Sequence, residues 1–266
     1  MNAPQHQPAP RGGRTLADIA ADIEQRIAAA PVRIRPFPHL VVDDLLPGEV
    51  LSNLDGLWPD PQRLRHSNSL RRTEMVVSNL AAHADGREKA FWEALRGLTT
   101  RLARVVRTRL QPHLSAKFRP LIGPDWRRRL GTPGYLDSDA MLANYTGVIE
   151  LPPHIDHARL VVNGFVYLGD KGSTPPEPLR GTMLYRSLGF AWPTNRTLPP
   201  GVVRDFLREA GEVEWRHNRL LAYVNGPTSF HGVPRHDIGS ERRRLLMFGS
   251  LLDAPTAKAL LDPALL

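Results

Sequence analysis

The spacing of hydrophobic residues changes along the chain, from a helical period in the first half to short strand-like runs after about residue 140. Near the start, apolar residues recur every three or four positions behind Thr15, a residue type that commonly caps helix N-termini. Pro47 is placed to open a short second helix, and a long stripe of the same period runs from about Arg87 to about Leu110. The apolar positions of these three predicted helices are Leu16, Ile19, Ile23 and Ile27; Val50, Leu51, Leu54 and Leu57; and Phe91, Trp92, Leu95, Leu98, Leu102, Val105, Val106 and Leu110. The longest stripe predicts a helix that packs against a sheet.

From Ala140 onward the apolar runs are short, β-rich in composition and separated by Gly, Pro, Asn and Asp. The predicted strands are residues 141–145, 149–151, 160–168, 182–186, 212–215, 220–224, 229–233 and 243–251. So many strands in so short a stretch favour a closed double-sheet jelly roll over alternating βα units. The Pro-rich stretch 188–210 interrupts them, and we predict one short helical piece within it, near residues 204–210.

These patterns divide the chain into four parts. Residues 1–14 are rich in Pro and Gln and carry no signal-peptide pattern, so we interpret them as a disordered leader. Residues 15–135 are the helical N-terminal support of the same domain, 136–252 its jelly-roll core, and 253–266 a C-terminal tail. The expected fold class is mainly β with flanking helices.

The composition limits the chemistry. The chain contains no cysteine, which excludes disulfides, thiolate zinc sites and iron–sulfur clusters and leaves only N and O ligands for a metal. On this ground we expect a cytoplasmic protein. The sequence has no run of ~18 apolar residues, so we expect no membrane-spanning helix. The net charge of +8 invites a polyanionic partner, yet only four of the 35 Lys and Arg residues are lysines. We interpret the arginine excess as a coding-composition bias and the arginine run 127–129 as a solvated loop, so nucleic acid is not the expected partner.

Two His-x-Asp pairs occur in different surroundings. His83 and Asp85 lie in a polar segment before the long predicted helix, where Asp85 fits an N-cap and His83 a surface position. His154 and Asp156 lie between the end of one predicted strand and the start of a long apolar one. Side chains two positions apart on an extended chain face the same side, so His154 and Asp156 can bind one ion. We predict a metal-binding role for the second pair only.

His231 is the candidate for a third ligand, because it follows a strongly apolar strand on a turn-to-strand segment. Two neutral imidazoles and one carboxylate are the facial ligand set of non-haem Fe(II) oxygenases, which leaves three adjacent positions for a chelating co-substrate and dioxygen. Hydrolytic zinc sites use the same residue types, so the ligand set alone leaves zinc open. The arginine cluster 242–244 favours iron, because a planar guanidinium suits bidentate binding of the distal carboxylate of an acidic co-substrate. Arg242 and Arg244 share one face of the predicted strand.

On these residues the chain resembles the iron(II)- and 2-oxoglutarate-dependent dioxygenase superfamily, on the branch near prolyl 4-hydroxylase-like enzymes. The matching segments are 36–47 (PFPHLVVDDLLP), 142–156 (LANYTGVIELPPHID), 166–170 (VYLGD), 180–185 (RGTMLY), 229–233 (SFHGV) and 242–246 (RRRLL). The resemblance covers roughly residues 36–252 and implies a distorted double-stranded β-helix in which His154, Asp156 and His231 hold Fe(II). It further implies that 2-oxoglutarate chelates the metal and places its distal carboxylate on Arg242. Arg244 stands where a hydroxyl residue is usual, so the anchor is open between these two arginines.

The activity that the resemblance implies is oxidative decarboxylation of 2-oxoglutarate to succinate and carbon dioxide by dioxygen, coupled to hydroxylation of an unactivated C–H bond. Tyr145 matches a tyrosine that often contacts the co-substrate, and a buried core aromatic is an equally good interpretation of it. The carboxylate of Asp156 argues against a halogenase, which in this superfamily lacks that ligand. We predict a small metabolite or an amino-acid-like molecule as the substrate.

Three alternatives stay open. A protein side-chain hydroxylase is compatible with the same motifs. A nucleic-acid demethylase fits the pI of about 10.4 and the Asn144-Tyr145 pair, but position 248 is Phe where those enzymes typically carry a second arginine. A non-catalytic jelly-roll protein is the third, and the intact triad argues against it. The sequence does not indicate the oligomeric state.

Overall fold

The computed structural model describes residues 14–66, 72–169, 179–194, 198–239 and 242–265. Its α-helices are α1 (Leu16–Ala29), α2 (Gly48–Leu57), α3 (Val77–Ala82), α4 (Gly86–Leu110), α5 (Ser115–Ile122), α6 (Trp126–Leu130), α7 (Pro200–Phe206) and α8 (Ala254–Leu260). Its strands are β1 (His39–Val42), β2 (Arg65–His66), β3 (Arg72–Val76), β4 (Tyr135–Asp137), β5 (Met141–Tyr145), β6 (Val148–His154), β7 (Leu160–Gly169), β8 (Thr182–Ser187), β9 (Leu207–Val213), β10 (Arg219–Val224), β11 (His231–Asp237) and β12 (Arg243–Leu252). Among the helices described, none has both the length and the apolar composition needed to cross a membrane.

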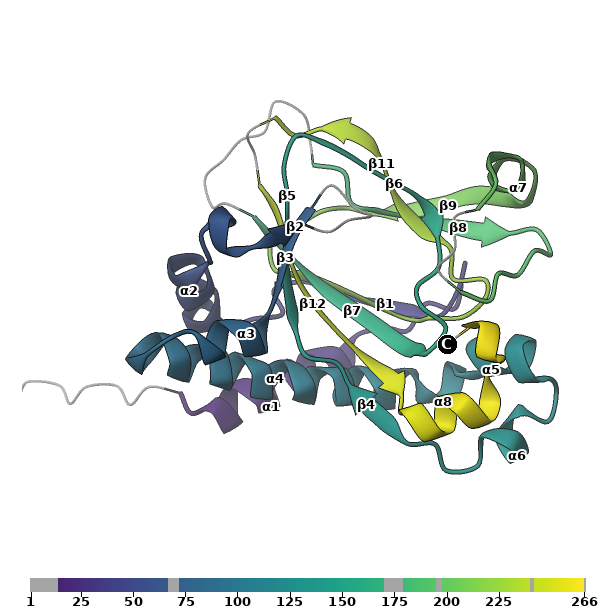
Figure 1. The fold of residues 1–266 in the computed structure, drawn as a ribbon, viewed down its shortest axis with the longest axis horizontal. Coiled ribbons are helices and arrows are strands. Elements are labelled where there is room, and N and C mark those ends of the chain that lie inside the picture. Colours follow the sequence, from purple (N-terminus) through teal and green to yellow (C-terminus); the bar gives the residue numbers. More distant parts are fainter. Residues whose placement is uncertain (1–13, 67–71, 170–178, 195–197, 240–241, 266) are drawn as a thin grey trace, which may run out of the picture.

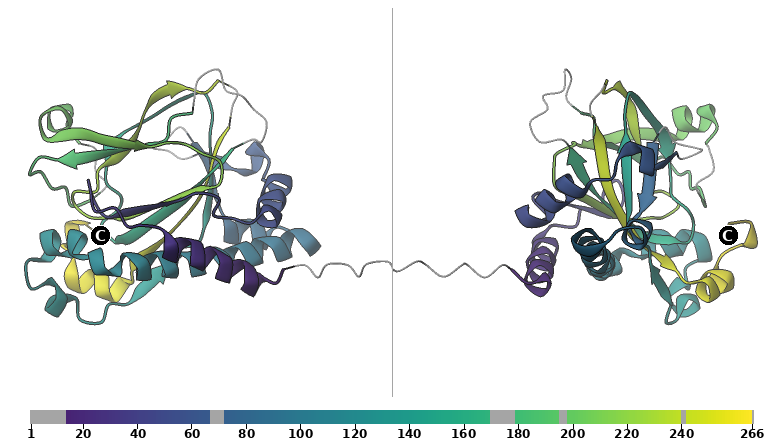
Figure 2. Two further views of the ribbon diagram at one scale, coloured as in Figure 1. Left: turned by 180° about the vertical axis from the view of Figure 1, so that it is seen from behind. Right: turned by 60° about the vertical axis from the view of Figure 1, so that its left-hand side comes forward.

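The first and longest helices form where the hydrophobic spacing predicts them. Thr15 and Asp18 close a capping box at the start of α1, each side chain accepting the backbone N–H of the other. Six of the eight predicted apolar residues of α4 are buried, together with Thr99 and Ala103, whereas Phe91 and Val105 are only partly buried. This helix packs across the outer side of β7 and β12, and α1 packs against α4 (Figures 1 and 2). Burial of these stripes, rather than helix propensity, holds the two helices in place.

The strands form two antiparallel sheets that face each other (Figure 1). The large sheet has the order β1-β10-β7-β12-β5-β3-β2 with β4 paired to β12, and the small sheet has the order β6-β11-β8-β9. From β5 to β12 the chain crosses to the other sheet at every step except from β8 to β9, which is the path of a double-stranded β-helix. The predicted fold class is confirmed, with one correction: the described strands do not close into one barrel, because every strand pairing stays within its own sheet.

The central strands of the large sheet are buried on both faces. Val166 pairs with Leu246, and both point outward to the core beneath α4. Their neighbours Tyr167 and Leu245 also pair, and point inward to a second core between the sheets. Because successive side chains alternate between faces, a strand with two cores reads as a continuous apolar run, as the sequence of β7 does.

Two expectations meet a different outcome, and the expected C-terminal tail has a helix of its own. Residues 204–210 were expected to be helical, but α7 ends at Phe206 and β9 follows, because residues 207–213 pair with β8 along their whole length. The arginine run 127–129 lies on α6 rather than in a loop, although its side chains are exposed as expected. The expected tail contains α8, which buries Ala257 in the core beneath the large sheet. Residues 1–13 of the predicted leader lie outside the described residues.

Candidate metal centre

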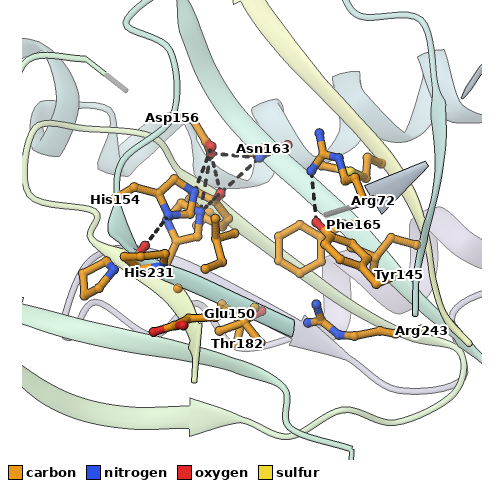
Figure 3. A pocket seen from close by; sticks show the side chains of 18 of the residues that line it. Arg72, Tyr145, Glu150, His154, Asp156, Asn163, Phe165, Thr182, His231 and Arg243 are labelled. Atoms are coloured by element: carbon orange, nitrogen blue, oxygen red, sulfur yellow. Dashed lines mark hydrogen bonds and ion pairs between the residues drawn. The ribbon is translucent and has the colours of Figure 1, made fainter. Parts of the chain in front are cut away.

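The three predicted ligands meet at one end of the space between the sheets (Figure 3). His154 is the last residue of β6 and His231 the first of β11, and the two are paired across the small sheet. Asp156 follows two residues after the end of β6. The ligand atoms of the three side chains all lie within 4.8 Å of one another, and each imidazole Nε2 is 3.8 Å from an oxygen of Asp156.

Both imidazoles direct their Nε2 atom to this point. His154 Nδ1 lies 3.0 Å from the carbonyl oxygen of Pro152, and His231 Nδ1 lies 3.0 Å from that of Ser229. A carbonyl can only accept, so each Nδ1 carries the proton and each Nε2 is unprotonated when the ring is neutral. A backbone acceptor behind each ring is the usual arrangement for histidines that bind a metal.

The residues next to the ligands are fixed on the opposite side. Ile155 and Phe230 are both buried in an apolar cluster with Leu198 and Leu207 of the 188–210 stretch. Phe190 stacks on Phe230 with ring centroids 5.9 Å apart. The alternation that turns Ile155 into this cluster turns His154 and Asp156 toward the cavity, as the sequence spacing predicts.

Two side chains of the large sheet hold the carboxylate of Asp156. The Tyr223 hydroxyl donates to Asp156 Oδ2 at 2.5 Å, and Asn163 Nδ2 donates to the same oxygen at 2.9 Å. Tyr223 and Asn163 are paired neighbours on β10 and β7, and Asn163 Nδ2 also lies 3.0 Å from the Tyr223 oxygen. His231 Nε2 is 2.9 Å from that same phenol. With Oδ2 held in this way, Oδ1 is the oxygen of Asp156 left for an ion.

The protonation states suit cation binding. Burial lowers the pKa of His154 to about 4, and the neighbouring His231 acts in the same direction, so the His154 imidazole is neutral at physiological pH. Desolvation acts to raise the pKa of Asp156, but the two imidazoles and the Tyr223 hydrogen bond outweigh it, and the net pKa is lowered. Desolvation and the adjacent Asp156 carboxylate raise the pKa of Tyr223, so the phenol stays neutral and serves as a donor.

A cavity of about 550 Å³ extends from the triad between the two sheets. Its far end is formed by three paired residues of the large sheet: Arg72 on β3, Tyr145 on β5 and Arg243 on β12 (Figure 3). Arg72 Nη1 donates to the Tyr145 hydroxyl at 3.1 Å, and Arg72 Nε donates to Glu74 at 2.6 Å. The wall between the two ends is mostly apolar, formed by Leu151, Pro152, Pro153, Phe165, Leu198, Val233, Leu245 and Met247.

Arg243 is the unusual member of this end. Its side chain is 1% exposed and lies beside the rings of Tyr145 and Tyr167, with its guanidinium carbon 5.5 and 5.7 Å from their centroids. Within the part of the chain that the structure describes, its guanidinium makes no hydrogen bond or ion pair. A buried charge without a partner is costly, and its natural partner is an anion that enters the cavity.

The other arginines of the cluster lie elsewhere. Arg242 precedes β12, is exposed, and does not line the cavity. Arg244 points to the opposite side of the large sheet, where it lies over the Trp58 ring and 4.0 Å from Asp55. The alternation of faces expected from the sequence is present, but it is Arg243 that points inward. Tyr145 lines the cavity, and it is also 5% exposed and part of the inner core, so both interpretations of this residue stay open.

His83 and Asp85, the other His-x-Asp pair, lie between α3 and α4 and do not line the cavity. His83 is exposed at the end of α3 and bonds to the carbonyl of Asn79, and Asp85 precedes α4 without a side-chain capping bond. Sequence analysis missed Arg72, Asn163 and Tyr223. A signal existed for Asn163, which is the one amide in a ten-residue apolar strand and therefore needs a buried partner. Arg72 follows a polar run and gives no comparable signal.

No protein-family model and no curated protein matches the sequence. Among solved structures, the chain is similar to a Pseudomonas putida prolyl-4-hydroxylase, with 14% identity, coverage of 89% of this chain and 100% of that one, and a TM-score of 0.48. It is similar to HygX from Streptomyces hygroscopicus with nickel, 2-oxoglutarate and hygromycin B bound, at 14% identity, 81% and 83% coverage and a TM-score of 0.44. It is also similar to an oxidoreductase of the 2OG-Fe(II) oxygenase family from Burkholderia pseudomallei, at 12% identity, 94% and 95% coverage and a TM-score of 0.43. At such identities these likenesses concern the fold alone.

Proposed function

We propose that the protein is an Fe(II)- and 2-oxoglutarate-dependent dioxygenase that hydroxylates an unactivated C–H bond. The observation that carries the proposal is the pairing of a His-Asp-His triad at one end of the cavity with a buried, unpartnered guanidinium, that of Arg243, at the other. Such a cavity fits a small dianion that binds a metal with one end and an arginine with the other. This assignment replaces Arg242 as the anchor.

The donor set fits Fe(II). His154 and His231 offer neutral nitrogens, Asp156 offers one oxygen, and the cavity side of the triad is left to other ligands. Fe(II) bound there would supply the binding and activation of dioxygen, with 2-oxoglutarate as the electron donor.

The charges also balance. A divalent ion, the Asp156 carboxylate and the Arg243 guanidinium sum to +2, which equals the charge that 2-oxoglutarate neutralises. The other charged residues of the cavity have partners of their own: Arg72 lies 2.6 Å from Glu74, and Glu150 lies 3.4 Å from Arg235. A 2-oxo acid of the same length that lacks the distal carboxylate would leave Arg243 unpaired, so the site favours a dicarboxylate.

The protein's own side chains position this co-substrate. The two-pronged guanidinium of Arg243 accepts a carboxylate in a bidentate manner. Because the Tyr145 oxygen accepts from Arg72, the hydroxyl hydrogen of Tyr145 is left to donate into the cavity. Apolar residues such as Phe165 and Leu245 line the path between the two ends and exclude water from it.

We further propose a small metabolite or amino-acid-like molecule as the substrate. A cavity of about 550 Å³ lies within the range of small-molecule sites, and residues of both sheets line it. A protein side-chain hydroxylase is the alternative, and a screen for succinate release with amino acids and peptides as separate candidates distinguishes the two. A cytoplasmic location stays a prediction from the cysteine-free sequence.

The test is an anaerobic titration of 2-oxoglutarate into the Fe(II)-loaded protein, followed through the visible charge-transfer band of a 2-oxo acid chelated to iron. We expect the band in the wild type and in His83→Ala, and its loss in His154→Ala. Arg243→Gln should need at least about 30-fold more 2-oxoglutarate, in line with the loss of a buried charge pair, while its matched control Arg242→Gln should behave as the wild type.

Two results would overturn the proposal. If iron binds and no band forms, the co-substrate is wrong and a hydrolytic metal site takes its place. If Arg242→Gln weakens binding and Arg243→Gln does not, the anchor is wrong. A positive result leads to a screen for succinate release, with free amino acids and peptides as separate arms.

A further inference from the structure

Lys117 is the most deeply buried ammonium group in the described part of the chain, and neither the fold nor the proposed reaction accounts for it. It lies on α5, outside the cavity, and its side chain is 1% exposed. No carboxylate lies within ion-pair distance of it in the described residues. Its nitrogen instead donates to two backbone carbonyls, that of Ala158 at 2.7 Å and that of Asn225 at 3.0 Å.

These two carbonyls belong to the two segments that lead to the metal ligands. Ala158 comes two residues after Asp156, and Asn225 comes six residues before His231. Asn225 reinforces the link, because its side chain accepts from the backbone N–H of Asp156 at 3.2 Å and donates to the carbonyls of His157 and Leu160. One lysine thus ties together the segment after β6 and the turn before β11.

The packing of α5 against the turn leaves little freedom. A Cβ atom on Gly226 would lie 2.6 Å from the carbonyl oxygen of Ala116 and 3.1 Å from the Cα of Lys117, so only glycine permits this approach. Ser229 then closes the turn through bonds with the backbone N–H and carbonyl of Gly226. Lys117 is therefore linked by packing and hydrogen bonds to the turn that leads into β11.

We propose that Lys117 is a positioning residue of the metal centre, which sets the separation of the Asp156 and His231 segments and couples cation binding to the loss of its own positive charge. The proposal rests on the metal centre proposed above. The hydrogen-bond geometry is the first support, because a neutral amine has two N–H donors and the structure gives its nitrogen two carbonyl acceptors.

Electrostatics is the second support. Burial lowers the pKa of Lys117 from 10.5 to about 7, and the Asp156 carboxylate acts against this shift. A divalent ion on Asp156 offsets that attraction, so ion binding lowers the pKa of Lys117 further and releases a proton near neutral pH. Conversely, metal affinity rises as the pH increases through 7, by about tenfold for each unit by which the ion lowers the pKa.

Few other charged groups act on Lys117. The segment after β6 brings Asp156 and His157, and the neighbouring Arg159 donates to the carbonyl of Leu252, away from the lysine. The described residues of the turn 225–229 bring no ionisable side chain. On α5 itself, the Phe118 ring centroid lies 6.0 Å from the lysine nitrogen, and Arg119 is exposed.

The first experiment uses the wild-type protein. The chain has four lysines, so selective ¹³C labelling at Cε gives a spectrum of few signals. The Lys117 signal is assigned from Lys117→Gln or, if that variant does not fold, as the signal that remains when Lys89, Lys171 and Lys258 are each replaced by Arg. The pKa of Lys117 is then measured with and without Zn(II), which is diamagnetic and binds the same ligand types. We expect a pKa near 7 that falls by at least one unit when Zn(II) is bound.

The outcomes separate the two proposals. The imidazole signals of His154 and His231 are followed in ¹H–¹⁵N spectra of the same protein, and if they do not respond to Zn(II), the metal centre is wrong. If they respond and the pKa of Lys117 does not move, or if Lys117 titrates near 10 throughout, the metal centre stands and the role of Lys117 is overturned.

A second measurement compares Zn(II) affinity in the wild type, in Lys117→Met and in the control Ile122→Val. Ile122 is also buried on α5, but its side chain makes no hydrogen bond to the segment after β6 or to the turn before β11. We expect the ratio of dissociation constants, Lys117→Met to wild type, to increase about tenfold between pH 6 and pH 9, because only the wild type sheds a positive charge. For Ile122→Val the ratio should be constant. A constant ratio for Lys117→Met would reduce Lys117 to a structural residue.

Discussion

The two ends of the cavity differ in how well the protein satisfies its own polar groups. At the metal end, every ligand has a partner: Asp156 accepts from Tyr223 and Asn163, and both imidazoles bond to backbone carbonyls. At the other end, Arg243 is buried without a partner among the described residues. The metal end is therefore organised before an ion arrives, whereas the arginine end is complete only with an anion. The same kind of substitution should then have opposite effects on stability at the two ends.

The largest expected effect is the loss of the metal. Asp156→Ala removes one of three ligands and should weaken Zn(II) binding by more than about 100-fold, beyond the range found when an outer partner of a ligand is removed. Isothermal titration calorimetry measures this directly. Asp85→Ala removes the carboxylate of the other His-x-Asp pair and should leave the affinity unchanged; a loss in both variants would point to a general effect on folding.

The second largest effect is expected at the arginine end, on the stability of the ligand-free protein. Arg243→Met removes an unpaired buried charge and should stabilise the ligand-free protein by roughly 1–4 kcal/mol, while abolishing co-substrate binding. Thermal unfolding without ligand measures the gain, and Arg242→Met is the exposed control, for which no gain is expected. If Arg243→Met destabilises the protein, the guanidinium is satisfied in the ligand-free state and the contrast between the two ends disappears.

A smaller effect is expected for the residue that holds the Asp156 carboxylate. Tyr223→Phe deletes the 2.5 Å hydrogen bond to Oδ2 and should weaken Zn(II) binding by about 10- to 100-fold, as removal of outer-sphere partners does elsewhere. Tyr167→Phe is matched to it, because that hydroxyl is equally buried but donates to Thr182. Equal losses in both variants would argue against a specific role for Tyr223.

The smallest effect concerns the Tyr145 hydroxyl. Tyr145→Phe should raise the dissociation constant for 2-oxoglutarate about 2- to 10-fold, the contribution of one hydrogen bond of roughly 0.5–1.5 kcal/mol. The charge-transfer titration detects such a change, and Tyr185→Phe, outside the cavity, is the control. An unchanged constant would leave Tyr145 as a core aromatic only.

The same contrast separates what the sequence predicts from what it does not. The metal end can be predicted from local rules. His154 and Asp156 are two residues apart on an extended chain and so face the same side, and His231 lies where a turn leads into a strand. The arginine end depends on register, because a shift of one residue in a strand exchanges its two faces. Only the pairing of Arg243 with Tyr145 across β12 and β5 decides which arginine points inward.

The helical expectation for residues 204–210 fails for a related reason. Their helix propensity is local, but β8 offers backbone partners to the whole stretch from Leu207 to Val213, and this distant pairing prevails. Lys117 gives no sign in sequence either, since a lysine on a short helix is ordinarily exposed.

The separation of the two sheets has a mechanical consequence. His154 and His231 belong to the small sheet, whereas Arg243 and Tyr145 belong to the large one, and no strand pairing joins the two layers in the described residues. A bound ion and a dianion that span the cavity would connect the small sheet to the large sheet. Their binding should add to the hydrogen bonds by which Tyr223 and Asn163 already hold Asp156, and should slow amide exchange in both sheets.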